Sequence, residues 1–218
     1  METNKIEIRT LLISMAIVVF LEWVSRILVS RVLVSIPVNP MIILGAVRVV
    51  ETIMIFVIVL FWGRGMSSIG LTGAGILPGL KKGLIWSAGF GTLCGIAFGV
   101  LFAVGINPLS LIHTRLPATH SKIMVFFLVG GIVGPIAEEV FFRGILYGFF
   151  RRWGAIAAVC LSTLAFILAH PVVSGISLPQ VIGGIVFAVA YEVEKSLMVP
   201  ITIHALGNTA IFTLTLVA

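Results

Sequence analysis

The feature that most constrains this chain is its series of apolar runs, many of them close to the roughly 20 residues that a helix needs to cross a bilayer. Of its 218 residues, 60% are hydrophobic and only 10% are charged, whereas soluble domains carry about 25% charged residues. A soluble fold cannot hide this much apolar side chain from water, but a bilayer can. We therefore predict an all-α integral membrane protein, a polytopic bundle of about seven transmembrane helices. The expected spans are Leu11–Ser30, Met41–Trp62, Gly83–Val104, Ile123–Phe150, Gly154–His170, Leu178–Tyr191 and Leu197–Val217.

The bundle is expected to form one membrane domain, because no linker, charge block or repeat divides the chain. Residues 1–110 carry no recognisable motif, and residues 111–218 carry every polar pattern described below. The net charge of +6 comes from basic residues scattered between apolar runs. Scattered charges predict membrane orientation and contact with anionic lipid rather than nucleic-acid binding.

Basic residues favour a cytoplasmic N-terminus. With that orientation, the residues facing the cytoplasm are Lys5, Arg9, Arg64, Lys81, Lys82, Arg151, Arg152 and Lys195, and those facing outward are Arg31, Arg115 and Lys122.

Charged groups inside a span are costly, so each needs an explanation. The fourth span contains the adjacent pair Glu138 and Glu139, with Arg143 one helical turn after Glu139. Glu139 and Arg143 can pair on one face of the helix. Glu138 points about 100° away and is left without that partner, which suits a general acid or base. We also expect Gly134 and Pro135 to open the helix just before the pair.

Two later spans carry the other polar candidates. Phe166 precedes His170 by one turn, and the following proline disfavours helix at His170, so the imidazole is expected where the fifth span stops. In the seventh span, His204 and Asn208 are four residues apart and share a face. Taken singly, each pattern also fits a helix-packing role. Counted along the helices, however, all of these groups fall within about half a bilayer thickness of one another.

Together these residues resemble the CAAX-protease and bacteriocin-processing (CPBP) family, which includes the type II CAAX prenyl endopeptidases. Its three motifs, E-E-x-x-x-R, F-x-x-x-H and H-x-x-x-N/D, stand here in order as Glu138-Glu139…Arg143, Phe166…His170 and His204…Asn208. The resemblance covers residues 120–213. It implies an intramembrane glutamic endopeptidase in a bacterial or archaeal cell membrane.

The resemblance also implies roles for the motif residues. Glu138 and His170 would activate a water for attack on a peptide carbonyl, and His204 and Asn208 would donate hydrogen bonds to the developing oxyanion. Glu139 with Arg143 would hold the fourth span, and Phe166 would pack behind His170. The substrate is expected to be a membrane-associated protein or peptide, cut near its C-terminus. The sequence does not indicate an oligomeric state.

Three alternatives remain open. Glu138, His170 and His204 are an adequate ligand set for a catalytic zinc, although we favour a cofactor-free reaction because Asn208 suits an oxyanion donor better than a ligand. A transporter or proton relay is the second. The further pairs Glu22 with Arg26 and Arg48 with Glu51 would fit it, but their spacing of four and three residues predicts ordinary intrahelical ion pairs. The third is a non-catalytic membrane scaffold.

Overall fold

The structure, a computed structural model, describes residues 6–32, 38–112, 114–170 and 177–217, and these contain helices and connecting turns but no strand. The α-helices outside the fourth span are α1 (Ile8–Ile27), continued by a π-helical turn (Leu28–Val32), α2 (Pro40–Phe61), α3 (Ile76–Ala103), α7 (Ala155–Ala169), α8 (Leu178–Glu194) and α9 (Met198–Val217). Short 3-10 turns precede α3 (Met66–Ile69 and Gly73–Gly75) and follow it (Pro108–Leu111). The fourth span is a composite rod of α4 (His120–Leu128), a π segment (Val129–Val133), α5 (Gly134–Glu139), a second π segment (Val140–Tyr147), α6 (Gly148–Phe150) and a 3-10 turn (Arg151–Trp153).

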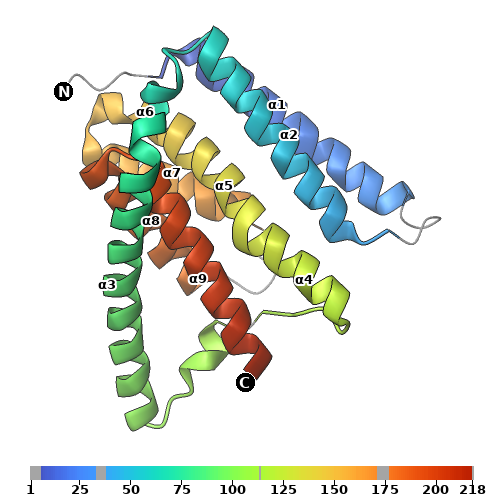
Figure 1. The fold of residues 1–218 in the computed structure, drawn as a ribbon, viewed down its shortest axis with the longest axis vertical. Helices are drawn as coiled ribbons and strands as arrows, with labels where there is room; N and C mark the ends of the chain where they lie inside the picture. Colours follow the sequence, from blue (N-terminus) through green and yellow to red (C-terminus); the bar gives the residue numbers. More distant parts are fainter. Residues whose placement is uncertain (1–5, 33–37, 113, 171–176, 218) are drawn as a thin grey trace.

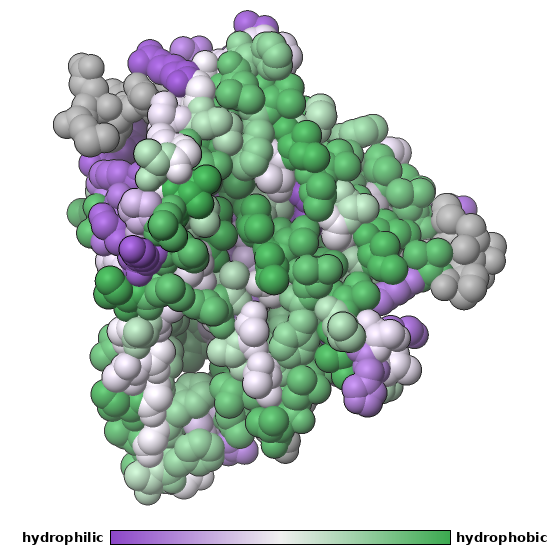
Figure 2. Space-filling view, viewed as in Figure 1, coloured by the Kyte–Doolittle hydropathy of each residue, from purple (hydrophilic) through white to green (hydrophobic). Residues whose placement is uncertain are grey.

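The predicted all-α membrane fold is confirmed. Within the part of the chain that the structure describes, five of these rods are long and apolar enough to cross a membrane: Ile8–Arg31, Pro40–Phe61, Met66–Ala103, His120–Trp153 and Met198–Val217. The remaining two expected spans are the shorter helices α7, with 15 residues, and α8, with 17. Large apolar side chains are exposed on most helices, and apolar residues cover most of the visible surface (Figure 2). The chain is therefore an integral membrane protein.

Small residues set the distances between the helices around the composite rod. In Figure 1, α1 and α2 lie side by side on one flank, and α3 stands on the other flank with α9. A Cβ atom at Gly45 of α2 would lie 2.8 Å from Val129 Cγ2, and one at Gly83 of α3 would lie 2.5 Å from Thr202 Cβ. The backbones of these helices approach this closely because glycine has no side chain.

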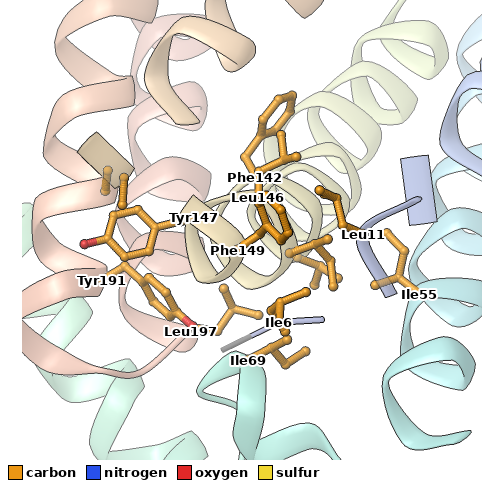
Figure 3. Packing of buried hydrophobic residues seen from close by; sticks show 14 of the residues in the cluster. Ile6, Leu11, Ile55, Ile69, Phe142, Leu146, Tyr147, Phe149, Tyr191 and Leu197 are labelled. Carbon is orange, nitrogen blue, oxygen red and sulfur yellow. The ribbon is translucent and has the colours of Figure 1, made fainter. Parts of the chain in front are cut away.

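A hydrophobic core lies at the end of the bundle where α1 begins (Figures 1 and 3), and several ion pairs lie near it. The core joins α1, α2, the composite rod and α8 through Ile6, Leu11, Ile55, Tyr147 and Tyr191, among others.

Two of the ion pairs connect segments that are distant in sequence, and a third joins residues three apart. Glu192 pairs with Arg151 at 2.9 Å and with Lys195 at 2.7 Å, and Glu194 pairs with Lys82 at 2.6 Å. Arg152 Nη2 donates to the Ile6 carbonyl at 2.6 Å. Basic residues that the sequence places on one side of the membrane therefore gather at one end of the bundle. Lys5 lies outside the described residues.

One predicted ion pair is wrong. Glu22 does not pair with Arg26 of its own helix but with Arg48 of α2, at 2.7 Å. Arg48 also pairs with Glu51, at 2.8 Å, as expected from the sequence. Because α1 and α2 pack along each other, the guanidinium of Arg48 meets Glu22 across the interface, whereas Arg26 is exposed.

Candidate functional site

The composite rod changes its helical geometry on both sides of the Glu138–Glu139 pair. The sequence predicts an opening at Gly134 and Pro135, and the structure places both at the start of α5, directly after the π segment Val129–Val133. Proline has no N–H to donate to the preceding turn, and such a missing bond commonly accompanies a local change of helical geometry. The π segment Val140–Tyr147 follows the pair, and π segments inside α-helices are frequent at functional sites.

Glu139 is the centre of a buried charged network. Its Oε1 atom accepts from Arg143 Nη1 at 2.9 Å and contacts His204 Nδ1 at 2.7 Å, and both Glu139 and Arg143 are fully buried. The predicted Glu139–Arg143 pair is confirmed. Its link to His204 was not predicted, because nothing in the spacing along the fourth span shows which carboxylate faces α9.

Arg143 contacts residues of three helices. Besides Glu139, its guanidinium donates from Nη2 to the Gly184 carbonyl of α8 at 3.0 Å. The guanidinium carbon lies 4.9 Å from the ring centre of Phe166 and 5.3 Å from that of Phe187. A cation enclosed by aromatic faces and a carboxylate is stabilised without water, so Arg143 fixes the positions of α5, α7 and α8 around the site.

His170 ends α7, as predicted from the following proline. Its backbone is extended, with φ −92° and ψ 140°. Its Nδ1 atom lies 2.7 Å from the Phe166 carbonyl, which can only accept a hydrogen bond. Nδ1 therefore carries a proton, and the neutral ring presents an unprotonated Nε2. That Nε2 lies 3.7 Å from Glu138 Oε2.

His204 approaches the same carboxylate from α9. Its Nδ1 donates to Glu139, so Nε2 of the neutral ring is again unprotonated, and it lies 3.8 Å from Glu138 Oε2. Both separations exceed hydrogen-bond length, so neither imidazole is bonded directly to Glu138. The carboxylate of Glu138 and the two imidazoles thus converge, as the sequence predicts. Glu138 retains 17% of its side-chain exposure and His170 retains 25%.

Aromatic rings hold both imidazoles in place. Phe166 lies 4.6 Å from His170 between ring centres, which confirms its expected position behind that histidine. Phe187 of α8 stacks on His204 at 4.6 Å with 20° between the planes. Sequence reasoning missed Phe187, because one phenylalanine in an apolar helix carries no signal that separates it from other core residues.

Asn208 lies one turn beyond His204 on α9, and its contact was not predicted. Its Nδ2 donates to the Gly130 carbonyl in the first π segment at 2.9 Å. An amide nitrogen has two protons, so one remains for another acceptor. Gly130 and Gly131 allow this approach, since a Cβ atom there would lie 3.2 Å from Phe212 and 3.0 Å from Thr209.

The arrangement of the three zinc candidates was compared with a tetrahedral site. Ligand atoms of a tetrahedral zinc lie about 3.3 Å apart, whereas Glu138 Oε2 lies 3.7 and 3.8 Å from the two Nε2 atoms. Among the residues that the structure describes, no group of three or more His, Cys, Asp or Glu side chains is placed to hold a metal ion.

Comparison with known proteins shows what this segment resembles. Residues 120–210 match the family model described as "Type II CAAX prenyl endopeptidase Rce1-like". This segment is similar to that family. The match contains every motif residue from Glu138 to Asn208, so the resemblance seen in the sequence is confirmed over this part of the chain.

Two curated proteins match over similar lengths. The chain is 36% identical over 100 residues to "Membrane-embedded CAAX protease MroQ" of Staphylococcus aureus (strain USA300), covering 40% of this chain and 38% of that protein. It is 33% identical over 86 residues to "Putative membrane peptidase YdiL" of Bacillus subtilis (strain 168), covering 39% of this chain and 35% of that protein. The matched part is therefore little more than a third of either relative. No solved structure matches the chain.

Proposed function

We propose that this chain is an intramembrane endopeptidase that uses an activated water to cut membrane-associated proteins or peptides near their C-termini. The observation that carries the proposal is the convergence of Glu138 Oε2 with the Nε2 atoms of His170 and His204, at 3.7 and 3.8 Å. The Rce1-like match over residues 120–210 and the names of the two relatives support a peptidase.

In the proposed reaction, a water between Glu138 and His170 attacks the peptide carbonyl. Glu138 or the unprotonated Nε2 of His170 takes a proton as the new carbon–oxygen bond forms. The same proton then passes to the leaving nitrogen as the carbon–nitrogen bond breaks. No covalent intermediate with the protein is required.

The proposed oxyanion donors are His204 and Asn208. For Nε2 of His204 to donate, the ring must carry a second proton, and the resulting imidazolium would be ion-paired with Glu139, 2.7 Å from Nδ1. The second amide proton of Asn208 would complete the pair of donors. Such donors stabilise the charge that develops in the transition state.

Glu139 and Arg143 are proposed to support the site without touching the substrate. Glu139 fixes the orientation and tautomer of His204, as outer-shell carboxylates do for histidines elsewhere. Arg143 offsets the charge of Glu139 in a region that excludes water. Both roles agree with the expectation that this pair holds the fourth span.

The reaction is proposed to need no metal or other cofactor. A zinc-dependent reaction is the alternative, supported by the Glu139–His204 contact, because a carboxylate bound to Nδ1 commonly orients a zinc-binding histidine. Chelation tests this choice, as described in the Discussion.

The proposed setting is a bacterial or archaeal cell membrane with the N-terminus in the cytoplasm. The ion-pair end of the bundle, which carries Arg151, Lys82 and Lys195, would then face the cytoplasm. The proposed partners are the bilayer and a membrane-associated substrate, and no nucleic acid. The family description contains the words "CAAX prenyl endopeptidase", so prenylated CAAX proteins are one candidate substrate class.

The experiment is comparative mass spectrometry of membrane-protein C-termini in cells that express the wild-type chain, Glu138→Gln, or the control Glu7→Gln at an exposed site. We expect new C-termini with wild type and Glu7→Gln, and none with Glu138→Gln. A scaffold would give the same C-termini with all three variants, and that result would refute the proposal.

A further inference from the structure

A second charged cluster lies outside the Rce1-like segment. Arg48 of α2 contacts Glu22 of α1 at 2.7 Å and Glu51 of its own helix at 2.8 Å. Glu51 is only 2% exposed, and its Oε1 has no hydrogen-bond partner among the described residues. Two carboxylates and a guanidinium inside membrane-spanning helices are costly, so packing alone is a weak reason for them.

The packing of α2 places this cluster level with Glu138. Gly45 of α2 meets Val129, before Glu138 in the composite rod, and Ile55 of α2 belongs to the same buried core as Val140, after it. Arg48 and Glu51 lie between these two contact points. The side chain of Glu138 leans back toward Gly134, since a Cβ atom there would lie 3.9 Å from Glu138 Oε1.

The helix that carries the cluster packs against the one that carries Glu138. α2 contacts α5, which contains Glu138, and the π segment that precedes α5. Residues from the unmatched N-terminal part of the chain therefore contribute to the environment of the proposed base.

We propose that Arg48, held by Glu22 and Glu51, is a positioning residue for Glu138. It supplies the positive charge on the α1–α2 side of the site, and it joins these two helices so that they form one wall of the site. This inference rests on the proposed peptidase function.

The charged groups near Glu138 show why Arg48 matters. His170 from α7 and His204 from α9 lie against its carboxylate. The other charged groups on the surrounding helices are Glu139 and Arg143 of the composite rod, Arg48 and Glu51 of α2, and Glu22 of α1. Glu139 and Arg143 offset each other. Without Arg48, the carboxylates of Glu22 and Glu51 would lose the cation that pairs with both, since Arg26 of α1 is exposed, and an ionised Glu138 beside them would be disfavoured.

The test measures cleavage of quenched-fluorescent peptides, each anchored by a prenyl group or a hydrophobic segment, by purified chain in phosphatidylethanolamine–phosphatidylglycerol liposomes. The variants are Arg48→Gln, Arg48→Lys and the double change of Arg48→Gln with Glu51→Gln. Arg26→Gln, at an exposed position on the neighbouring α1, is the matched control. Rates are divided by the amount of folded protein, measured separately by thermal unfolding.

We expect Arg48→Gln to lower kcat about 10- to 100-fold, with KM unchanged. This loss is typical when a residue that positions an active-site side chain is removed. Arg48→Lys should recover most of kcat because the charge is kept. The double variant should recover part of it, because one uncompensated carboxylate is removed.

Two results would overturn the inference. One is a kcat for Arg48→Gln equal to that of Arg26→Gln. The other is a loss that neither Arg48→Lys nor the double variant recovers, since this indicates a purely structural residue. The variant Glu138→Gln distinguishes a failure of this inference from a failure of the proposed function. If Glu138→Gln still cleaves the peptides, or if the wild-type chain cleaves none of them, the proposed function fails as well.

Discussion

Glu138 and Glu139 are adjacent in sequence, yet substituting each by glutamine should have different consequences. Glu139 is fully buried, and its Oε1 is shared by Arg143 at 2.9 Å and His204 at 2.7 Å. Glu139→Gln leaves the guanidinium of Arg143 buried without an opposing charge. Breaking a buried ion pair in this way typically costs about 3–5 kcal/mol, which corresponds to a fall in Tm on the order of 10 °C for a chain of this size.

Glu138 has no such structural partners. It is partly exposed, and the imidazole nitrogens facing it lie beyond hydrogen-bond distance. Glu138→Gln should therefore change the free energy of unfolding by less than about 1 kcal/mol while abolishing cleavage. Thermal unfolding in detergent micelles and peptide cleavage in liposomes, measured on both variants, give the two quantities.

The two assays together distinguish a structural role of each glutamate from a catalytic one. We expect Glu139→Gln to lose stability and activity together, and Glu138→Gln to lose activity alone. Equal Tm values for wild type and Glu139→Gln would show that the buried network does not hold the helices. A large fall in Tm for Glu138→Gln would show that this carboxylate is structural.

Further predictions concern the oxyanion donor, the helix contacts and the metal. Asn208→Ala should lower kcat about 100-fold or more with little change in KM; an unchanged kcat would remove Asn208 from the mechanism. Gly83→Ala should destabilise the fold by about 1–3 kcal/mol, because the added Cβ would lie 2.5 Å from Thr202 Cβ. Gly91→Ala on the same helix, with open space around it, should not destabilise, and thermal unfolding compares the two. Strong chelators should leave cleavage intact; loss on chelation with recovery on added zinc would favour the metal-dependent reaction.

Much of the fold follows from patterns along the chain. The seven expected spans correspond to the helical rods of the structure, because apolar runs bounded by Gly and Pro indicate membrane helices. The start of the third span was wrong: α3 begins at Ile76 and not at Gly83, because a helix continues beyond its apolar run and includes Lys81 and Lys82. The sequence did not predict the composite character of the fourth span, whose π segments flank Glu138 and Glu139. Single-helix periodicity cannot show them, since π geometry depends on how neighbouring helices pack.

The site was predictable in its members but less so in its connections. Spacing within one helix gave the Glu139–Arg143 pair and the position of His170. Contacts between helices depend on helix rotation, which one sequence does not determine. The Glu139–His204 bond, the stacking of Phe187 and the pairing of Glu22 with Arg48 therefore appeared only in the structure.

The most direct test of the peptidase proposal is product mass spectrometry with purified, liposome-embedded chain in water labelled with oxygen-18. Hydrolysis at the Glu138 site predicts that the wild-type chain releases a peptide whose new C-terminal carboxylate carries one labelled oxygen. An equally folded Glu138→Gln variant should release none. Labelled product from Glu138→Gln at the wild-type rate would contradict the assignment of Glu138 as the group that activates the water.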